Sequence, residues 1–213
     1  MSKLRKRHGF TLPEVLVTVV ILATITLSVT SVFIAASRTY RIGAVDQAAQ
    51  RMASGALQRM IPDVRAGMLV TPGVGVNADT HIILTLPNRV WNAGTQRHDY
   101  ELAEDATGAL GLVAGDTVHY YRGTAEGSMS ASGDRMWRMV VHADGTQGRT
   151  TCIATEVIDN PYSAAYGGAK PMFVYWPNEV LREAVEVTIT VRIRQEAKEA
   201  TRTARSEIAL RNL

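Results

Sequence analysis

The feature that most constrains this chain of 213 residues is a run of 22 residues without a charged side chain, from Val15 to Ala36. As an α-helix rising about 1.5 Å per residue, such a run is roughly 33 Å long, and the hydrocarbon core of a bilayer is about 30 Å thick. Backbone polar groups in lipid must pair within their own segment, so a helix is the expected form. We therefore predict that Val15 to Ala36 form a transmembrane helix.

Charge is distributed unevenly along the chain, and this gives the predicted helix a direction. The first nine residues carry +4, residues 10–66 carry +2 and residues 67–213 carry −3. Cytoplasmic flanks of membrane helices are enriched in Lys and Arg, so we expect the N-terminus in the cytoplasm and everything after Ser37 outside it. The slightly acidic balance of residues 67–213 also argues against a broad electrostatic surface for nucleic acid.

Two ordinary interpretations of this N-terminus stay open. One is a secretory signal peptide cut near Ala35-Ala36, and the other is a generic uncleaved anchor. The apolar run is longer than the usual 7–15 residues of a signal peptide. Glu14 also lies at its leading edge, where a carboxylate close to hydrocarbon is costly and therefore suggests a partner.

The six residues from Gly9 to Glu14 (GFTLPE) follow a short basic leader and precede the apolar run. This order resembles the class III signal of type IV prepilins and pseudopilins. The resemblance implies that a prepilin peptidase cuts between Gly9 and Phe10 and methylates the new amine of Phe10. It also implies that Glu14 pairs with the Phe10 amine of a neighbouring subunit and sets the axial register of a filament. Independently of a partner, Glu14 is a first-turn carboxylate that favours the helix dipole.

Residues 37–61 change from uniformly apolar to amphipathic. One helix is predicted from Pro13 to about Pro62–Ala66, with Gly43 and Gly55 as weak points that permit bending. Its apolar face is expected to pack on the protein's own sheet, with a separate partner helix as the alternative. That face repeats at steps of three and four residues: Ile42, Val45, Ala49, Met52, Ala56 and Met60.

Beyond Ala66, short apolar runs alternate with turn residues, which is typical of an antiparallel sheet. Residues 185–193 alternate strictly and predict a strand with one buried face. A polar stretch, Arg194–Arg202, then leads to a final strand at Ser206–Leu213 and a terminal hairpin. Other strands are expected at His81–Leu86, Thr117–Arg122, Trp137–His142, Thr151–Ile158 and Met172–Trp176, with loops at Asn77–Thr80, Glu126–Asp134 and Asn160–Lys170 and a turn at Asp144-Gly145.

The predicted fold class is therefore α+β. A long N-terminal helix spans the membrane with its first half and packs with its second half on an antiparallel sheet, as in pilins. The expected organisation is a leader at residues 1–9, a transmembrane and stem helix at residues 10–66, and a β-rich head at residues 67–213.

The head offers no convincing catalytic, cofactor or metal motif. Its histidines match no metal-ligand spacing, and His119 and His142 are expected to be structural residues in strands. The single cysteine, Cys152, is interpreted as a small core residue, and it excludes an intrachain disulfide. An acidic cluster is interpreted as solvated surface, with calcium binding as the alternative; its members are Asp99, Glu101, Glu104 and Asp105. A set of aromatic residues is interpreted as packing residues of the core and sheet, with an aromatic binding face as the alternative; its members are Tyr120, Tyr121, Tyr162, Tyr166, Tyr175 and Trp176.

A basic stretch near the C-terminus is a minor hypothesis for DNA contact, because some minor pilins act in DNA uptake. Glutamates interrupt it, which weakens that hypothesis. Its members are Arg192, Arg194, Lys198, Arg202 and Arg205.

Taken with the resemblance, these features indicate a non-enzymatic structural subunit of a type IV filament system, most like a minor pilin or a J-type minor pseudopilin. The implied partners are prepilin peptidase, other pilin or pseudopilin subunits, an inner-membrane assembly platform and, before assembly, membrane lipid. The implied location is a single-pass inner-membrane protein whose head is periplasmic or extracellular, and later a pilus or pseudopilus. A type II secretion pseudopilin and a membrane-anchored extracytoplasmic enzyme stay open as alternatives.

Overall fold

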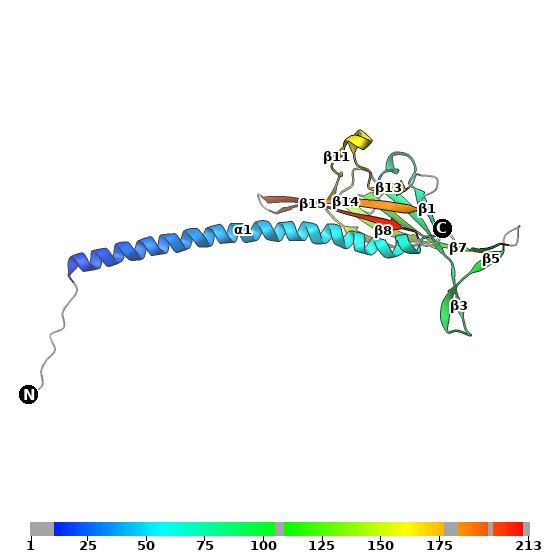
Figure 1. Ribbon diagram of the computed structural model, residues 1–213, viewed down its shortest axis with the longest axis horizontal. Coiled ribbons are helices and arrows are strands. Elements are labelled where there is room, and N and C mark those ends of the chain that lie inside the picture. The colour runs from blue at the N-terminus through cyan, green and yellow to red at the C-terminus, as the bar shows by residue number, and fades with distance from the viewer. Residues whose placement is uncertain (1–10, 105–108, 177–182, 196–197, 211–213) are drawn as a thin grey trace, which may run out of the picture. The chain divides into compact units, whose positions relative to one another are not determined.

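The computed structural model describes residues 11–104, 109–176, 183–195 and 198–210. It divides into two compact units, Met1–Ala44 and Val45–Leu213. One long helix, α1 (Leu12–Ala66), contributes residues to both units, and antiparallel sheets make up most of the second (Figure 1). The α+β class predicted from the sequence is confirmed.

The helix α1 ends where the sequence places its stop signals. Pro62 lies inside its last turns, and the helix terminates at Ala66. The backbone N–H of Gly67 donates to the carbonyl of Asp63 at 2.9 Å and of Val64 at 3.2 Å, so it caps two of the free carbonyls at the helix end. Gly43 and Gly55 both lie within the unbroken helix.

The larger sheet has five strands, and each strand pairs antiparallel with its neighbours. Their spatial order is β1-β2-β7-β8-β9, so β1 and β9 form the two edges. The strands are β1 (Leu69–Pro72), β2 (His81–Pro87), β7 (Ala114–Gly123), β8 (Arg135–Val141) and β9 (Gln147–Ala154).

The second sheet is built on the C-terminal hairpin. β14 pairs with β15 over 12 residues on one side, and with β13 and β10 on the other. The polar stretch predicted to separate the last two strands is itself part of both, so the final strand begins earlier than predicted. The strands are β10 (Val157–Ile158), β13 (Phe173–Trp176), β14 (Ala184–Gln195) and β15 (Lys198–Ala209).

Three small hairpins lie outside the two main sheets. The first two project from the larger sheet between β2 and β7, and the sequence analysis did not predict them. The third lies within the predicted loop Asn160–Lys170. They pair β3 (Arg89–Asn92) with β4 (Arg97–Tyr100), β5 (Leu102–Glu104) with β6 (Leu110–Leu112), and β11 (Tyr162–Ser163) with β12 (Gly168–Ala169); short 3₁₀ turns occur at η1 (Gly75–Asn77) and η2 (Ala164–Tyr166).

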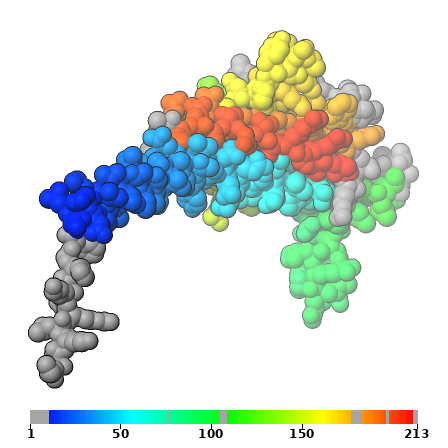
Figure 2. All heavy atoms as spheres, turned by 60° about the vertical axis from the view of Figure 1, so that its left-hand side comes forward, coloured from blue at the N-terminus to red at the C-terminus, as the bar shows by residue number. Residues whose placement is uncertain are grey.

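One hydrophobic core joins the helix to both sheets. Figure 2 shows β14 and β15 lying against the C-terminal part of α1. The helix contributes several alanines to the core, and their small side chains allow the sheets to approach its backbone closely. We call this set the packed face: Val45, Ala49, Ala53, Ala56, Leu57, Met60 and Val64 are all buried.

The packed face largely confirms the predicted apolar stripe. Two members depart from the prediction: Ile42, at the N-terminal end of the stripe, is exposed, and Met52, in its middle, is only half-buried. The core partners on the sheets are also those that the alternation predicts, such as Val185, Val187 and Ile189 of β14.

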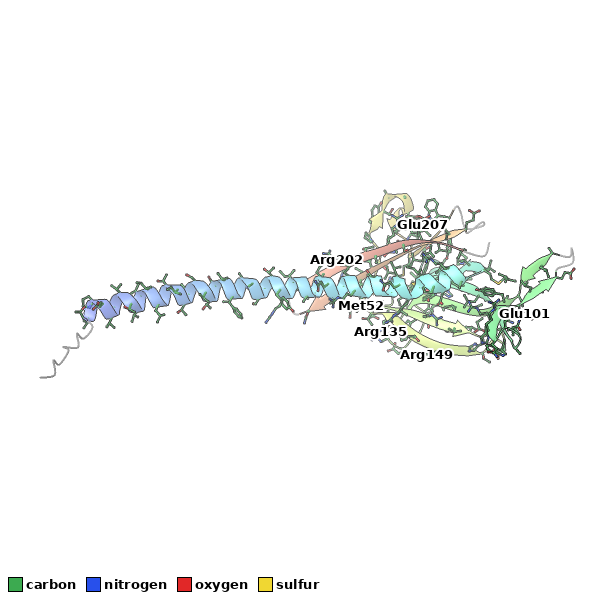
Figure 3. All side chains as sticks on the ribbon, turned by 60° about the horizontal axis from the view of Figure 1, so that its bottom comes forward. Met52, Glu101, Arg135, Arg149, Arg202 and Glu207 are labelled. Atoms are coloured by element: carbon green, nitrogen blue, oxygen red, sulfur yellow. The ribbon has the colours of Figure 1, made fainter. Side chains whose placement is uncertain are left out.

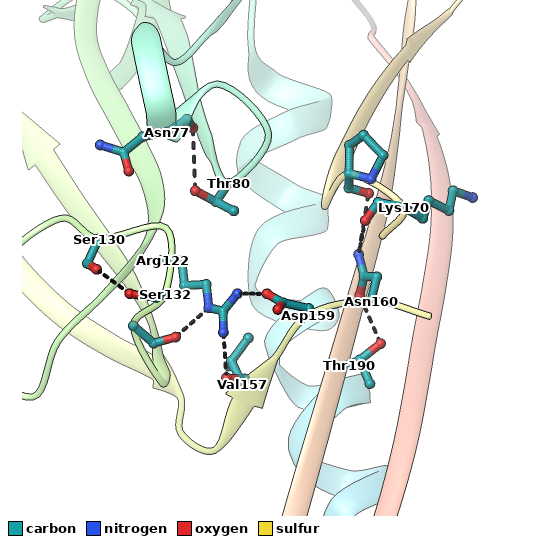
Figure 4. Close-up of polar contacts among 12 residues, drawn as sticks. Asn77, Thr80, Arg122, Ser130, Ser132, Val157, Asp159, Asn160, Lys170 and Thr190 are labelled. Atoms are coloured by element: carbon teal, nitrogen blue, oxygen red, sulfur yellow. Dashed lines mark hydrogen bonds and ion pairs between the residues drawn. The ribbon is translucent and has the colours of Figure 1, made fainter. Parts of the chain in front are cut away.

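The prediction that β14 has one buried face is wrong. Glu186, Thr188 and Thr190 point away from the core, yet all three are buried. The segment that contains β11 and β12 covers them, and Asn160 fixes it in place. The amide of Asn160 donates to the carbonyl of Lys170 at 3.1 Å, and its oxygen accepts from the Thr190 hydroxyl at 2.8 Å (Figure 4). The same amide donates to the carbonyl of Thr188 at 3.1 Å.

Two predicted strands also have different boundaries. The single strand expected at Thr151–Ile158 is two strands, because Glu156 adopts a left-handed backbone (φ 56°) and moves the chain from β9 to β10, in the other sheet. The strand that ends at Val141 leaves His142 at the following turn, which contains the predicted Asp144-Gly145.

We expect the packed face to tolerate no additional volume. Ala53→Leu should lower the free energy of unfolding by about 1–3 kcal/mol, because Ala53 is fully buried between helix and sheets. Gly55→Ala is the control: a Cβ there meets no atom within 4 Å, so it should raise stability by about 0.5–1 kcal/mol. Urea unfolding of the full chain in detergent, followed by tryptophan fluorescence, measures both. Equal stabilities would contradict the packing described.

Candidate functional site: an exposed apolar helix with a capped start

The start of α1 is a capped helix end. The backbone N–H and the hydroxyl of Thr11 donate to Oε2 of Glu14, at 3.2 and 3.3 Å. The Val15 N–H donates to the Thr11 carbonyl at 3.2 Å, which is the first helical hydrogen bond. Pro13 follows at the second helical position, where a missing N–H costs nothing.

Glu14 therefore has a local role that our sequence analysis missed. A Thr followed three residues later by Glu is the signature of a capping box, in which the glutamate accepts from the backbone N–H of the first residue. The signal was present in the sequence as Thr11-Leu12-Pro13-Glu14. Any pairing of Glu14 with a neighbouring amine must compete with this internal hydrogen bond.

Beyond this cap, the apolar side chains of α1 are exposed. Every residue from Thr11 to Ala36 is exposed, and by length and composition the helix is able to cross a membrane. Exposed apolar surface of this extent marks a contact with lipid or with protein. The large exposed side chains include Leu16, Val20, Ile21, Leu22, Ile25, Leu27, Val32 and Phe33.

The hydroxyl groups in the apolar segment are paired inside the helix. Thr18 donates to the carbonyl of Glu14, and Thr24 to that of Val20, each at 2.8 Å. Thr26, Ser28, Thr30 and Ser31 make equivalent bonds at 2.8 Å. These bonds satisfy the polar groups in an apolar environment, which a helix in lipid or in a helix bundle requires.

Gly9 and Phe10 lie outside the described residues. The predicted cut after Gly9 and the methylation of Phe10 therefore stay predictions, as does the pairing of Glu14 between subunits.

The head uses one half-buried carboxylate to join α1 to the larger sheet. Oδ2 of Asp63 accepts from the hydroxyl of Tyr120 at 2.6 Å and from Nε of Arg138 at 2.7 Å. Burial, together with the neighbouring Asp63, raises the pKa of the Tyr120 hydroxyl above its ordinary value. All three groups are paired with one another, so this cluster holds the fold together.

A second carboxylate, Glu186, is buried and lies on the outer face of β14. It accepts from Lys170, from Arg205 at 2.6 Å and from the Thr188 hydroxyl at 3.1 Å. Burial alone would raise the pKa of Glu186, but these three donors outweigh it and hold the pKa below its ordinary value. Nearby, Arg122 is buried and bound to Asp159 (Figure 4).

The histidines form structural contacts. His81 Nε2 and His119 Nδ1 are 3.2 Å apart across β2 and β7, and Thr117 hydrogen-bonds the other nitrogen of His119. His142 contacts Asp116 at an exposed turn, at 3.1 Å. His98 lies edge-on to Trp91, with ring centroids 5.1 Å apart.

The predicted acidic cluster does not converge on one point. Asp99 binds Arg97 and Asn92, Glu101 binds Asn88, and Asp105 lies outside the described residues. Among the residues that the structure describes, no group of three His, Cys, Asp or Glu side chains has the geometry to hold a metal ion.

Cys152 and the six aromatic residues named in the sequence analysis differ in how deeply they are buried. Cys152 is only half-buried, so it is less of a core residue than predicted, and burial raises the pKa of its thiol. Tyr120, Tyr121 and Tyr175 are buried, as the packing interpretation requires. The three remaining aromatic residues, Tyr162, Tyr166 and Trp176, are exposed.

The four arginines of the basic stretch on the C-terminal hairpin form ion pairs within the head. Arg192 and Arg194 both pair with Glu199, at 3.1 and 2.9 Å. Arg202 pairs with Asp46 of α1 at 2.6 Å, and Arg205 pairs with Glu186. These ion pairs favour a structural role for the arginines over DNA contact.

Comparison with known proteins adds one finding. Residues 4–36 match the family model described as the prokaryotic N-terminal methylation motif. The match covers residues 4–9 of the basic leader, the Gly9-to-Glu14 sequence and the apolar run. No curated protein and no solved structure matches the chain.

We expect the histidine pair to make the head sensitive to acid. Burial, and then the charge of His119, lower the pKa of His81 to about 4, against about 6.5 in an unfolded chain. Between these values the unfolded state binds more protons, so stability is complete above pH 6.5 and falls as the pH drops towards 4. The expected loss from pH 7.5 to 4.5 is about 2–3 kcal/mol.

His81→Phe should remove most of this loss, and His142→Asn, at an exposed site, should not. Urea unfolding of the full chain in detergent at several pH values measures the effect. Glu186 does not interfere, because its lowered pKa moves its own loss of stability below about pH 4.5. The same pH dependence in wild type and His81→Phe would refute the assignment.

Proposed function

We propose that this chain, whose N-terminal segment makes it a type IV prepilin-like or pseudopilin-like protein, is a non-enzymatic structural subunit of a type IV filament system, most like a minor pilin. One observation carries the proposal: the apolar surface of α1 from Leu12 to Ala36 is entirely exposed. Such a surface needs lipid before assembly and the helices of other subunits after assembly.

The proposed sequence of events starts at the inner membrane. The basic leader holds the N-terminus in the cytoplasm, and the helix inserts with the head on the outer side. Prepilin peptidase then cuts after Gly9 and methylates Phe10. The cut leaves the apolar helix on the mature protein, so the subunit stays anchored until the assembly platform extracts it.

The contact energies decide which interactions control assembly. Lipid is as apolar as the side chains it surrounds, so transfer from lipid to a helix bundle brings little hydrophobic gain. Packing between helices and between heads, and the pairing of charges, must supply the stability and the specificity. In the proposed filament, Glu14 gives up its bond to Thr11 for the amine of Phe10 on a neighbouring subunit, which fixes the axial register.

Two alternatives make different demands. A type II secretion pseudopilin would use the same helix and the same processing in a periplasmic pseudopilus. A membrane-anchored enzyme would need catalytic side chains that converge on one site in the head. Asp63 and Glu186 instead bind donors from other elements of the fold, which is a structural role. The motif family is structural, which favours the subunit.

We predict that the mature chain begins with an N-methylated Phe10. Mass spectrometry of the native N-terminus, in cells with and without prepilin peptidase, tests this. The methylated start should disappear without the peptidase, and the chain should then keep its leader. A mature protein that begins near Ser37 would establish the secretory interpretation instead.

A second prediction separates the two roles of Glu14. Glu14→Gln retains an oxygen that accepts from Thr11 and caps the helix, but it removes the charge that would pair with Phe10. We expect normal membrane insertion and strongly reduced incorporation into filaments, because an unpaired buried ammonium costs about 3–5 kcal/mol. Immunoblots of sheared filaments and membranes measure the partition.

Glu14→Asp is the matched control for charge, and it should incorporate better than Glu14→Gln. Thr11→Ala removes the hydroxyl of the cap and leaves the charge intact, so it should incorporate normally. Wild-type incorporation of Glu14→Gln would exclude the register role.

A further inference from the structure

A groove of about 400 Å³ lies between α1 and the edge strand β9. Its floor is apolar, with Met52 and Gly55 of the helix and Ile153 and Ala154 of the strand. A Cβ at Gly55 would meet no atom within 4 Å, so the groove is open above the helix backbone. Both walls belong to the second compact unit, Val45–Leu213.

Basic side chains border this groove. Arg51 and Arg59 line it from the helix and are exposed. Arg149 is also exposed on β9, three residues before Cys152, the first residue of that strand to line the groove. Figure 3 labels Met52 and Arg149 on the two elements that form the walls. None of the three arginines forms an ion pair with a carboxylate among the residues that the structure describes. The arginines of the C-terminal hairpin, by contrast, are paired.

The hairpin β5–β6 has the complementary character. Leu102 and Leu110 are 55% and 71% exposed, and Glu104 is exposed beside them. The described residues of the two strands contain no basic side chain. A two-stranded hairpin with exposed leucines is marginally stable alone and gains from a partner surface.

We propose that the groove binds the β5–β6 hairpin of a second copy of this chain. The two leucines would lie on the apolar floor, and Glu104 would face the arginines at the rim. Charge complementarity of this kind determines specificity and register more than raw affinity.

The location of the two surfaces determines the kind of contact. β5 lies beyond the C-terminal end of α1, whereas Met52 lies towards the opposite end of the head (Figures 1 and 3). The hairpin therefore meets the groove of another copy, and the contact is head-to-tail. Head-to-tail contacts that do not close into a ring produce filaments. This inference rests on the proposed filament function, to which it adds a specific contact between the heads of two subunits.

The native cysteine provides the test, because Cys152 lines the groove. The probe is a short bismaleimide added to the purified full chain, in detergent, carrying Leu110→Cys. We expect dimers and higher oligomers whose linked peptides join residues 110 and 152. The control places the second cysteine at Tyr162→Cys, which is 74% exposed on another hairpin, and it should give roughly tenfold less product.

A steric variant tests the groove without a change of charge. Gly55→Leu fills the groove and removes a helix-weakening glycine, so the chain should fold, and the 110–152 product should fall roughly tenfold. Gly43→Leu is the matched control, because a Cβ there also meets no atom within 4 Å but the residue is outside the groove. It should leave the product unchanged.

Charge reversal provides a third measurement. Arg51→Glu with Arg59→Glu should reduce the product to a similar extent, and the addition of Glu104→Arg should restore part of it. Links only between two copies of Cys152, equal yields from the Tyr162→Cys control, or a yield insensitive to Gly55→Leu would each overturn the proposal.

The outcome is separable from that of the proposed function. A 110–152 link without a methylated Phe10 start would support the contact and contradict the filament subunit. A methylated start without the link would support the subunit and contradict the contact.

Discussion

One helix must satisfy two different environments, and the rest of the structure depends on that constraint. From Thr11 to Ala36, α1 presents apolar side chains on all sides, as lipid or a helix bundle requires. From Val45 onward only the packed face is apolar, and two sheets cover it. The alanines of that face let both sheets reach the helix backbone, while Asp63 and Asp46 anchor one sheet each through Arg138 and Arg202. A change in helix composition thus separates anchor from core without a break in the backbone.

Features encoded in local periodicity could be predicted from the sequence. A charge-free run, a stripe at steps of three and four and a period-2 strand each have a direct physical cause. The prediction failed where tertiary contacts override the pattern. Glu186 and Thr188 alternate with valines as solvent-facing residues do, but Asn160 and Lys170, far away in the sequence, bury them. Nothing local distinguishes a polar face covered by a distant segment from one covered by water.

The missed elements have a related cause. β3 to β6 carry little alternation, because their side chains are exposed on both faces and no core selects a pattern. The break between β9 and β10 depends on the left-handed backbone of Glu156, and glutamate is not a residue type that predicts this conformation. The capping role of Glu14 was predictable, since Thr-x-x-Glu is a local signal. The family resemblance implies a partner for this carboxylate in a neighbouring subunit, whereas the structure shows its partner to be Thr11, three residues earlier in the same chain.

The distribution of paired and unpaired charges connects the fold to assembly. Inside the head, half-buried Asp63 and buried Glu186 each bind two or more donors, so removal of one donor leaves a charge partly uncompensated away from bulk water. At the surface, the arginines of the C-terminal hairpin are bound to carboxylates and contribute little to recognition. Arg51 and Arg59 border an apolar groove instead, where burial of a partner's carboxylate would strengthen each interaction. Glu14 belongs to the first kind in the structure, because its carboxylate caps its own helix, and in the proposed filament it would exchange that bond for a neighbouring amine. Charges that are satisfied within the chain therefore maintain the fold, and in the proposed filament those that a neighbour satisfies better would determine how copies align.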